Sequence, residues 1–199
     1  MDIAANQKYL RYNKGMKTFT REESWFSHFL LGDVRMSWLW LVVRLYLGWE
    51  WTVAGWEKIT NPAGTWVGDK AGVALSGFLQ GALKKTAEFC PPAPAACHPD
   101  VTSWYAWFTT NVALPNAQVL SYMVAYGELL VGVALILGFL VGWSAFFAIF
   151  MNLNFMLAGS LSVNPTWFML GLGLVLAWRT AGHIGLDYYV LPYLRRRRR

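Results

Sequence analysis

Ionisable side chains inside long apolar stretches are the residues of this chain whose types and positions suggest chemistry. Arg44 and Lys58 lie in one apolar stretch, and Glu128 lies in another. A charge near the centre of a bilayer costs roughly 2.5–3.5 kcal/mol on insertion scales, so each of these residues needs a partner or a task. From a rise of about 1.5 Å per residue, Arg44 and Glu128 are expected at nearly the same depth. We therefore predict an Arg44–Glu128 ion pair inside the protein.

Each of these polar residues also has a purely structural interpretation. A buried Arg44–Glu128 pair would lock a helical bundle with nothing bound there. Lys58 would serve equally well as an anchor whose long stem lets its ammonium reach the aqueous interface. An asparagine such as Asn154 bonds another helix more often than it bonds a substrate. The sequence leaves both interpretations open.

Helical spacing places these residues on defined faces. In the first apolar stretch, intervals of 4, 3, 4 and 3 put charged and small residues on one face, formed by Arg44, Gly48, Trp51, Gly55 and Lys58. Glu50 and Glu57 form a second polar line on the same stretch. The same spacing aligns Ser121, Ala125, Glu128 and Gly132 in the next stretch, and then Met151, Asn154 and Ala158, with Asn152 nearby. These faces are expected to turn toward the protein interior.

The composition places the faces in a membrane protein. Of the 199 residues, 56% are hydrophobic and 14% are charged, whereas soluble domains carry roughly 25% charged residues. The apolar pattern predicts an all-α, integral membrane four-helix bundle within residues 37–192, with spans at about 37–59, 116–140, 143–161 and 166–180. The first span should end at Thr60, Asn61 and Pro62, and only Val141 and Gly142 remain as a turn between the second and third spans. Residues 1–36 are basic, with an aromatic cluster that predicts an N-terminal interfacial helix.

Basic residues at both ends predict the orientation. They concentrate in residues 1–36 and in a tail at 193–199 that ends in five arginines. With an even number of spans, the positive-inside rule places both termini in the cytoplasm of a multi-pass protein of the cell membrane. The net charge of +6 then indicates contact with anionic lipid rather than with nucleic acid. Residues 60–115 form a long extracytoplasmic connection, where a Cys90–Cys97 disulfide is chemically allowed and a redox-active pair is the alternative.

The long connection is rich in aromatic residues. Two amphipathic stretches, 71–87 and 101–112, are expected to lie on the membrane surface or to cap the bundle. Aromatic side chains gather in the outer half of the protein: Trp49, Trp51, Trp56, Trp66, Trp104 and Trp107, with Tyr122 and Tyr126. Most of them fit an ordinary interfacial belt, but the same wall would bind a flat apolar ligand such as a quinone ring.

Four segments resemble, in the right order, the helix signatures of the DoxX/DoxD family. They are residues 44–58 (RLYLGWEWTVAGWEK), 125–138 (AYGELLVGVALILG), 151–159 (MNLNFMLAG) and 182–187. The resemblance spans roughly residues 37–190. The long aromatic connection makes the chain look like the DoxD branch, the membrane subunit of thiosulfate:quinone oxidoreductase.

The resemblance implies a membrane oxidoreductase subunit that oxidises thiosulfate to tetrathionate and passes electrons to quinone. In that reading Arg44, Lys58 and Glu128 are catalytic, because the cations would offset the thiosulfate dianion and a buried carboxyl would deliver protons to quinone. Contacts with substrate or quinone are expected from Trp51, Glu50, Asn154, Tyr122 and Trp56. Quinone is the expected electron acceptor, and no metal, haem or flavin is expected.

The family enzyme also includes a second subunit, DoxA, so a separate DoxA-like partner is expected in addition to membrane lipid. A homo-oligomer is left open. Two functions of other classes remain as alternatives. One is a non-catalytic membrane anchor that assembles soluble redox enzymes through its basic tails. The other is a small-molecule or lipid-binding membrane protein whose bundle cavity holds a ligand without redox change.

Overall fold

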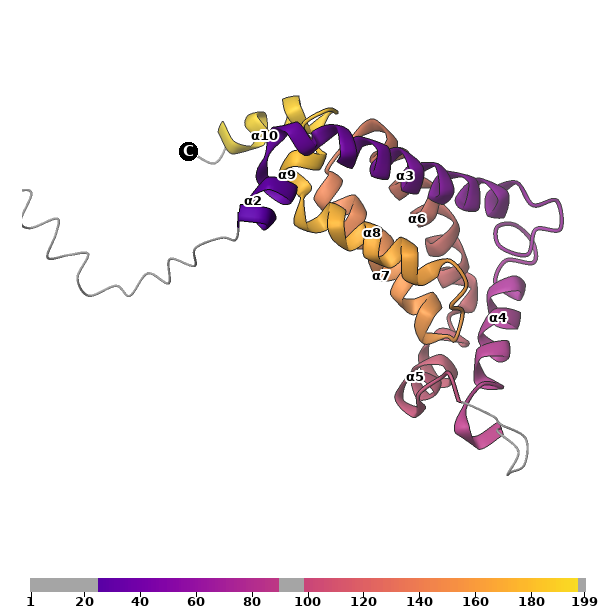
Figure 1. The fold of residues 1–199 in the computed structure, drawn as a ribbon. Coiled ribbons are helices and arrows are strands. Elements are labelled where there is room, and N and C mark those ends of the chain that lie inside the picture. Colours follow the sequence, from indigo (N-terminus) through magenta and orange to yellow (C-terminus); the bar gives the residue numbers. More distant parts are fainter. Residues whose placement is uncertain (1–24, 90–98, 197–199) are drawn as a thin grey trace, which may run out of the picture.

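The computed structural model describes residues 25–89 and 99–196, which are all-helical (Figure 1). Four longer helices lie side by side, namely α3 (Ser37–Thr60), α6 (Ala117–Leu137), α7 (Val141–Leu157) and α8 (Asn164–Leu176). Helix α3 packs mainly on α6, and α7 packs mainly on α8. One end of this group, here called the α9–α10 end, holds α2 (Trp25–Gly32), η1 (Val34–Met36), α9 (Trp178–Ala181) and α10 (Asp187–Arg196). The opposite end, the α4–α5 end, holds α4 (Val73–Leu83), η2 (Ala87–Phe89), α5 (Ser103–Phe108) and the π-helical turn η3 (Thr109–Ala113).

Helix ends follow the local chemistry of the chain. Helix α3 ends at Thr60, with Asn61 as its C-cap and Pro62 next, which confirms the predicted stop. The other three helices are shorter than predicted. Helix α7 already ends at Leu157, shortly before Gly159 with a φ of +73°, and α8 begins at Asn164 with a proline in its first turn.

The turn between α6 and α7 lies earlier in the chain than predicted. Gly138 ends α6 with a φ of +68°, a conformation that glycine adopts without steric cost. Leu140 follows with a φ of +45°, and the Asp187 carboxylate accepts hydrogen bonds from the amides of Leu140 and Val141 at 2.6 and 2.8 Å. The prediction of a turn at Val141 and Gly142 is therefore wrong, because this distant carboxylate caps α7 at its first residues.

Glycines bring α3 and α6 into direct backbone contact. A Cβ atom at Gly55 would lie 2.8 Å from the Cα of Leu129, and one at Gly48 would lie 2.9 Å from the carbonyl oxygen of Gly132. A Cβ at Gly132 would in turn lie 2.7 Å from the carbonyl oxygen of Gly48 and would also meet Thr52. The predicted buried face of α3 is confirmed, but α6 fills the room that its glycines leave.

Substituting alanine for Gly132 is expected to destabilise the fold by about 1–3 kcal/mol, because the new methyl group forces α3 and α6 apart. Gly127→Ala on the same helix is the control, since its Cβ would meet only the flexible Met151 side chain at 3.4 Å. That control should be neutral or stabilising by up to about 1 kcal/mol, from helix propensity. Unfolding in detergent micelles measures both, and equal effects would contradict the close contact.

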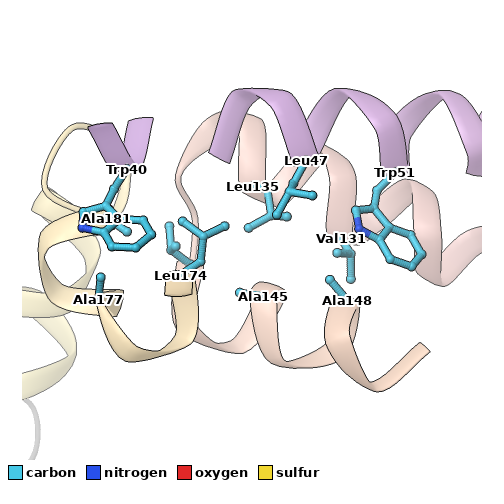
Figure 2. Packing of buried hydrophobic residues seen from close by; sticks show 11 residues of the cluster. Trp40, Leu47, Trp51, Val131, Leu135, Ala145, Ala148, Leu174, Ala177 and Ala181 are labelled. Atoms are coloured by element: carbon cyan, nitrogen blue, oxygen red, sulfur yellow. The ribbon is translucent and has the colours of Figure 1, made fainter. Parts of the chain in front are cut away.

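The centre of the four-helix group is a hydrophobic cluster to which all four helices contribute (Figure 2). Trp40, Leu47 and Trp51 come from α3, and Val131 and Leu135 come from α6. Alanines of α7 and of the α8–α9 region complete the cluster, together with Leu174. Small residues on two helices let large side chains of the other two fill the interior.

The predicted amphipathic stretches of the long connection are confirmed as helices. Helices α4 and α5 contribute to two small hydrophobic clusters, and one of these extends onto the end of α7 through Leu157 and Ala158. Phe78 of α4 also lies edge-on to Phe155 of α7, with ring centroids 6.0 Å apart. Lys85 donates a hydrogen bond to the carbonyl oxygen of Gly159 at 2.7 Å and so satisfies the turn after α7. The connection therefore caps one end of the four-helix group.

Among the described residues, α6 is the one helix whose length and composition together suffice to cross a membrane. Helix α3 has 24 residues but carries four charged side chains. Helices α7 and α8 are apolar, with 17 and 13 residues. The sequence-based interpretation of the four helices as four spans stays a prediction.

Candidate functional site: two polar centres

One polar centre joins α3 to α6 near the α4–α5 end. The Lys58 ammonium lies 2.6 Å from a carboxylate oxygen of Glu128, and the side chains are 19% and 1% exposed. Both residues lie on the inward faces that their spacing predicts. The Glu128 carboxylate is shielded from solvent, whereas the Lys58 side chain is partly exposed. Such a pair can bind an anion or exchange a proton from one side only.

The loop after α3 covers this centre. The Trp66 ring lies 5.1 Å from the Lys58 ammonium, a cation–π distance. Ser121 of α6 donates a hydrogen bond to the Trp66 carbonyl oxygen at 2.5 Å, and the Tyr122 hydroxyl lies 3.2 Å from the amide of Gly68. These contacts hold the loop against α6. The approach to the Lys58–Glu128 pair therefore passes beside Trp66.

The second polar centre surrounds Arg44 at the α9–α10 end. Its guanidinium donates hydrogen bonds to the carbonyl oxygens of Ala181 and Ile184 at 2.8 and 2.7 Å, and the side chain is 2% exposed. The caps that the Asp187 carboxylate gives to α7 lie in the same region. Sequence reasoning missed Asp187, although it closes the fourth segment that resembles the DoxX/DoxD signatures. This centre therefore connects α3, the turn between α6 and α7, and the segment that contains α9 and the start of α10.

The predicted Arg44–Glu128 ion pair is wrong, because the two residues belong to different centres. Arg44 lies beside Gly138 at the C-terminal end of α6, whereas Glu128 lies ten residues earlier, about 15 Å along the helix. The prediction estimated the depth of each residue from the expected end of its own helix. It assumed that helix ends on the same side of the bundle lie in one plane. In the structure, the Gly55 contact with Leu129 sets a different alignment, which places Lys58 beside Glu128.

Hydrophobic side chains fill the interior between the two centres. Leu47, Trp51, Val131 and Leu135 occupy this level of the bundle (Figure 2). Trp51 is only 2% exposed and lies against Trp167, with ring centroids 6.0 Å apart. The predicted role of Trp51 in contacting a quinone is therefore not supported by its position, because core side chains surround it. Packed hydrophobic side chains therefore separate Arg44 from Glu128.

The remaining predicted contact residues are dispersed. Trp56 is 58% exposed on the outer surface of α3, and Glu50 is half-buried. Tyr122 is half-buried beside the Lys58–Glu128 centre and stacks on Tyr126 at 6.4 Å. Asn154 lies instead against α5, where its carbonyl oxygen accepts a hydrogen bond from the Tyr105 hydroxyl at 2.9 Å. Of the predicted contact residues, Tyr122 lies against the loop that covers the pair, through its hydroxyl contact with Gly68.

Asn152 is the buried amide of α7. It is 1% exposed and donates a hydrogen bond to the side-chain oxygen of Asn164 at 3.0 Å. Asn164 donates in turn to the Ser160 carbonyl oxygen at 2.6 Å. These amides join α7 to the start of α8, so the buried amide of α7 has a structural role.

Replacing Tyr105 with phenylalanine is expected to cost about 1 kcal/mol at neutral pH, because the hydrogen bond to α7 is lost. Burial raises the pKa of Tyr105 from 10.0 to about 12. Ionisation is therefore easier in the unfolded chain, so the wild-type protein loses stability as the pH rises from 10 toward 12. The advantage of wild type over Tyr105→Phe should shrink across that window in thermal unfolding, and a constant difference would contradict the buried position.

Within residues 25–89 and 99–196, no cluster of three or more histidine, cysteine, aspartate or glutamate side chains could hold a metal ion. Cys90 and Cys97 lie outside the described residues, so their predicted disulfide stays a prediction.

Comparison with known families identifies the fold family. The family model of DoxX matches residues 39–159. Because the match covers more than half of the 199 residues, the chain belongs to the DoxX family, whose proteins are membrane-associated. No curated protein and no solved structure matches the chain significantly. The predicted likeness to the DoxD branch stays a prediction.

Proposed function

We propose that this member of the DoxX family is a multi-pass membrane subunit of an oxidoreductase of the thiosulfate:quinone type, with Lys58 and Glu128 as its reactive pair. The observation that carries the proposal is the 2.6 Å ion pair between a dry carboxylate and a partly exposed ammonium. An ionisable pair at this depth in an apolar bundle is a functional candidate. A separate DoxA-like subunit is part of the proposal.

The proposed membrane placement uses α3, α6, α7 and α8 as the four spans, with both termini in the cytoplasm. Two charged side chains of α3 have polar partners inside the bundle, and these contacts support the placement. Lys58 forms an ion pair, and Arg44 donates hydrogen bonds to carbonyl oxygens. Apolar side chains on the outer faces of α6 and α7 also support it, namely Val119, Met123, Leu130, Leu137, Trp143, Phe147 and Phe150. Helix α8, about 20 Å long, would cross together with α9.

The proposed reaction moves two electrons and two protons. Two thiosulfate dianions form the sulfur–sulfur bond of tetrathionate and release two electrons, and quinone takes up these electrons with two protons to become quinol. Lys58 offsets the charge of an approaching thiosulfate, and the Glu128 carboxyl passes protons toward the quinone. Both substrates would approach beside Trp66 and Tyr122, because hydrophobic side chains block the interior beyond the pair.

Thiosulfate-dependent reduction of a quinone analogue by the purified protein tests this function, with and without its second subunit. Glu128→Gln should lower kcat about 100-fold, the usual scale for a lost proton-transfer group. Glu57→Gln is the matched control, because it removes an exposed carboxylate of α3 that is not the ion-pair partner of Lys58. A wild-type protein that reduces no quinone under either condition would rule out the enzyme.

A non-catalytic membrane anchor for soluble redox enzymes is the second candidate. It is favoured by the two polar centres being bonded within the chain and separated by packed hydrocarbon. In that case the basic tail would bind the partner. Removal of Arg195 to Arg199 should then abolish co-purification of the redox partner, whereas an enzyme should keep its thiosulfate-dependent turnover after the same deletion.

A further inference from the structure

A pocket opens at the α9–α10 end, next to the Arg44 centre. Its volume is about 440 Å³, and α9, α10 and the turn between them form its walls. The residues that matter for its chemistry are Arg179, His183, Asp187, Tyr188, Leu191 and Pro192. One part of this wall is cationic or polar, and another part is apolar.

The available charge in this pocket is positive. Arg179 is exposed, with its guanidinium carbon 5.1 Å from the Trp178 ring, and no carboxylate within the described part of the chain pairs with it. Asp187 also lines the pocket, but it is 2% exposed and its two oxygens accept the amides of Leu140 and Val141. A ligand therefore meets the Arg179 cation rather than the Asp187 anion.

Two ring side chains that can donate hydrogen bonds line the pocket together with Arg179. His183 and Tyr188 are exposed, and their rings meet edge to face with centroids 5.4 Å apart. An imidazole and a phenol hydroxyl next to a guanidinium provide several hydrogen-bond donors in one place, which suits the oxygens of a phosphate group.

The apolar part of the pocket indicates where that phosphate comes from. Leu191 and Pro192 form the wall on α10, and the same helix exposes Tyr188, Tyr189 and Tyr193. Exposed tyrosines on a helix that also carries apolar and basic residues are typical of the membrane–water interface. We propose that this pocket binds the phosphate of an anionic phospholipid, with Arg179 at the headgroup and Leu191 and Pro192 along its glycerol and upper acyl carbons. The proposal goes beyond the oxidoreductase function and does not depend on it.

Thermal unfolding of the full chain in detergent, titrated with dihexanoyl phosphatidylglycerol, tests the site. The zwitterionic dihexanoyl phosphatidylcholine and inorganic phosphate are titrated in parallel. Arg179→Gln should weaken binding of the anionic lipid about tenfold, because a charge-assisted contact to phosphate is lost. Arg35→Gln, an exposed arginine in η1 at the same end, is the matched control and should change the affinity less than about twofold.

A variant that fills the pocket separates its shape from its charge. Leu191→Trp keeps every cation and should still weaken binding of the anionic lipid. Equal losses in Arg179→Gln and Arg35→Gln, or equal binding of the two lipids, would overturn the proposal. Protection by inorganic phosphate alone, abolished by Arg179→Gln, would assign the site to a soluble phosphate and overturn the lipid as its source.

Discussion

Replacing Lys58 with methionine is expected to destabilise the protein by about 3–5 kcal/mol, the usual cost of removing one partner from a buried ion pair. The Glu128 carboxylate is 1% exposed and would then either remain charged without a partner or take up a proton. Glu128→Gln should cost less, about 1–2 kcal/mol, because the Lys58 ammonium is partly exposed and keeps the Ala54 carbonyl oxygen within 3.4 Å.

A double-mutant cycle isolates the pair from the rest of the bundle. The Lys58→Met, Glu128→Gln double variant should be more stable than Lys58→Met alone, with a coupling free energy of about 2 kcal/mol or more. Titration with SDS in mixed micelles measures each unfolding free energy. Arg44→Met provides the contrasting cycle, because Arg44 and Glu128 lie in different centres and their effects should add within about 0.5 kcal/mol. A strong Arg44–Glu128 coupling, with none for Lys58, would contradict the structure.

Arg44→Met is expected to cost a further large amount, again about 3–5 kcal/mol, because a buried charged group with directed bonds is removed. The carbonyl oxygens of Ala181 and Ile184 would lose their donor, and the buried Asp187 would lose the compensating charge nearby. Arg44→Lys keeps the charge but cannot reproduce a fork that reaches two carbonyl oxygens, so an intermediate loss is expected.

Arg35→Gln is again the control for this prediction, since it removes an exposed arginine two residues before the start of α3. It should change the unfolding free energy by less than about 0.5 kcal/mol. Should Arg44→Met prove as mild as this control, the bonds to the α9–α10 turn would contribute little to stability.

Periodicity was enough to predict which faces of α3 and α6 turn inward, whereas on α7 the buried amide is Asn152 rather than Asn154 of the predicted face. Arg44, Gly48, Trp51 and Gly55 are all buried on α3, as their spacing indicates, and Ser121, Ala125, Glu128 and Gly132 are buried on α6. Local sequence also predicted the end of α3 before Pro62 and the two amphipathic stretches of the long connection. All these features depend on residues near one another in the chain.

The alignment of α3 against α6 was not readable in this way. It depends on where the glycines of one helix admit the backbone of the other, so the depth of a charge cannot be measured from a predicted helix end. The same limit applies to Trp51 and Trp56, which are close in sequence but lie in the core and on the outer surface. The number of aromatic residues predicted one aromatic wall in the outer half of the protein. Their positions around the helix instead place some of them in the core and others on the outer surface.

The cap that Asp187 gives to α7 has a consequence for biosynthesis. The hairpin of α6 and α7 is synthesised before residue 187, yet the left-handed Leu140 and the first amide of α7 find their acceptor only in that later segment. The hairpin is therefore complete only after the segment around Asp187 has been synthesised and has packed against the turn between α6 and α7.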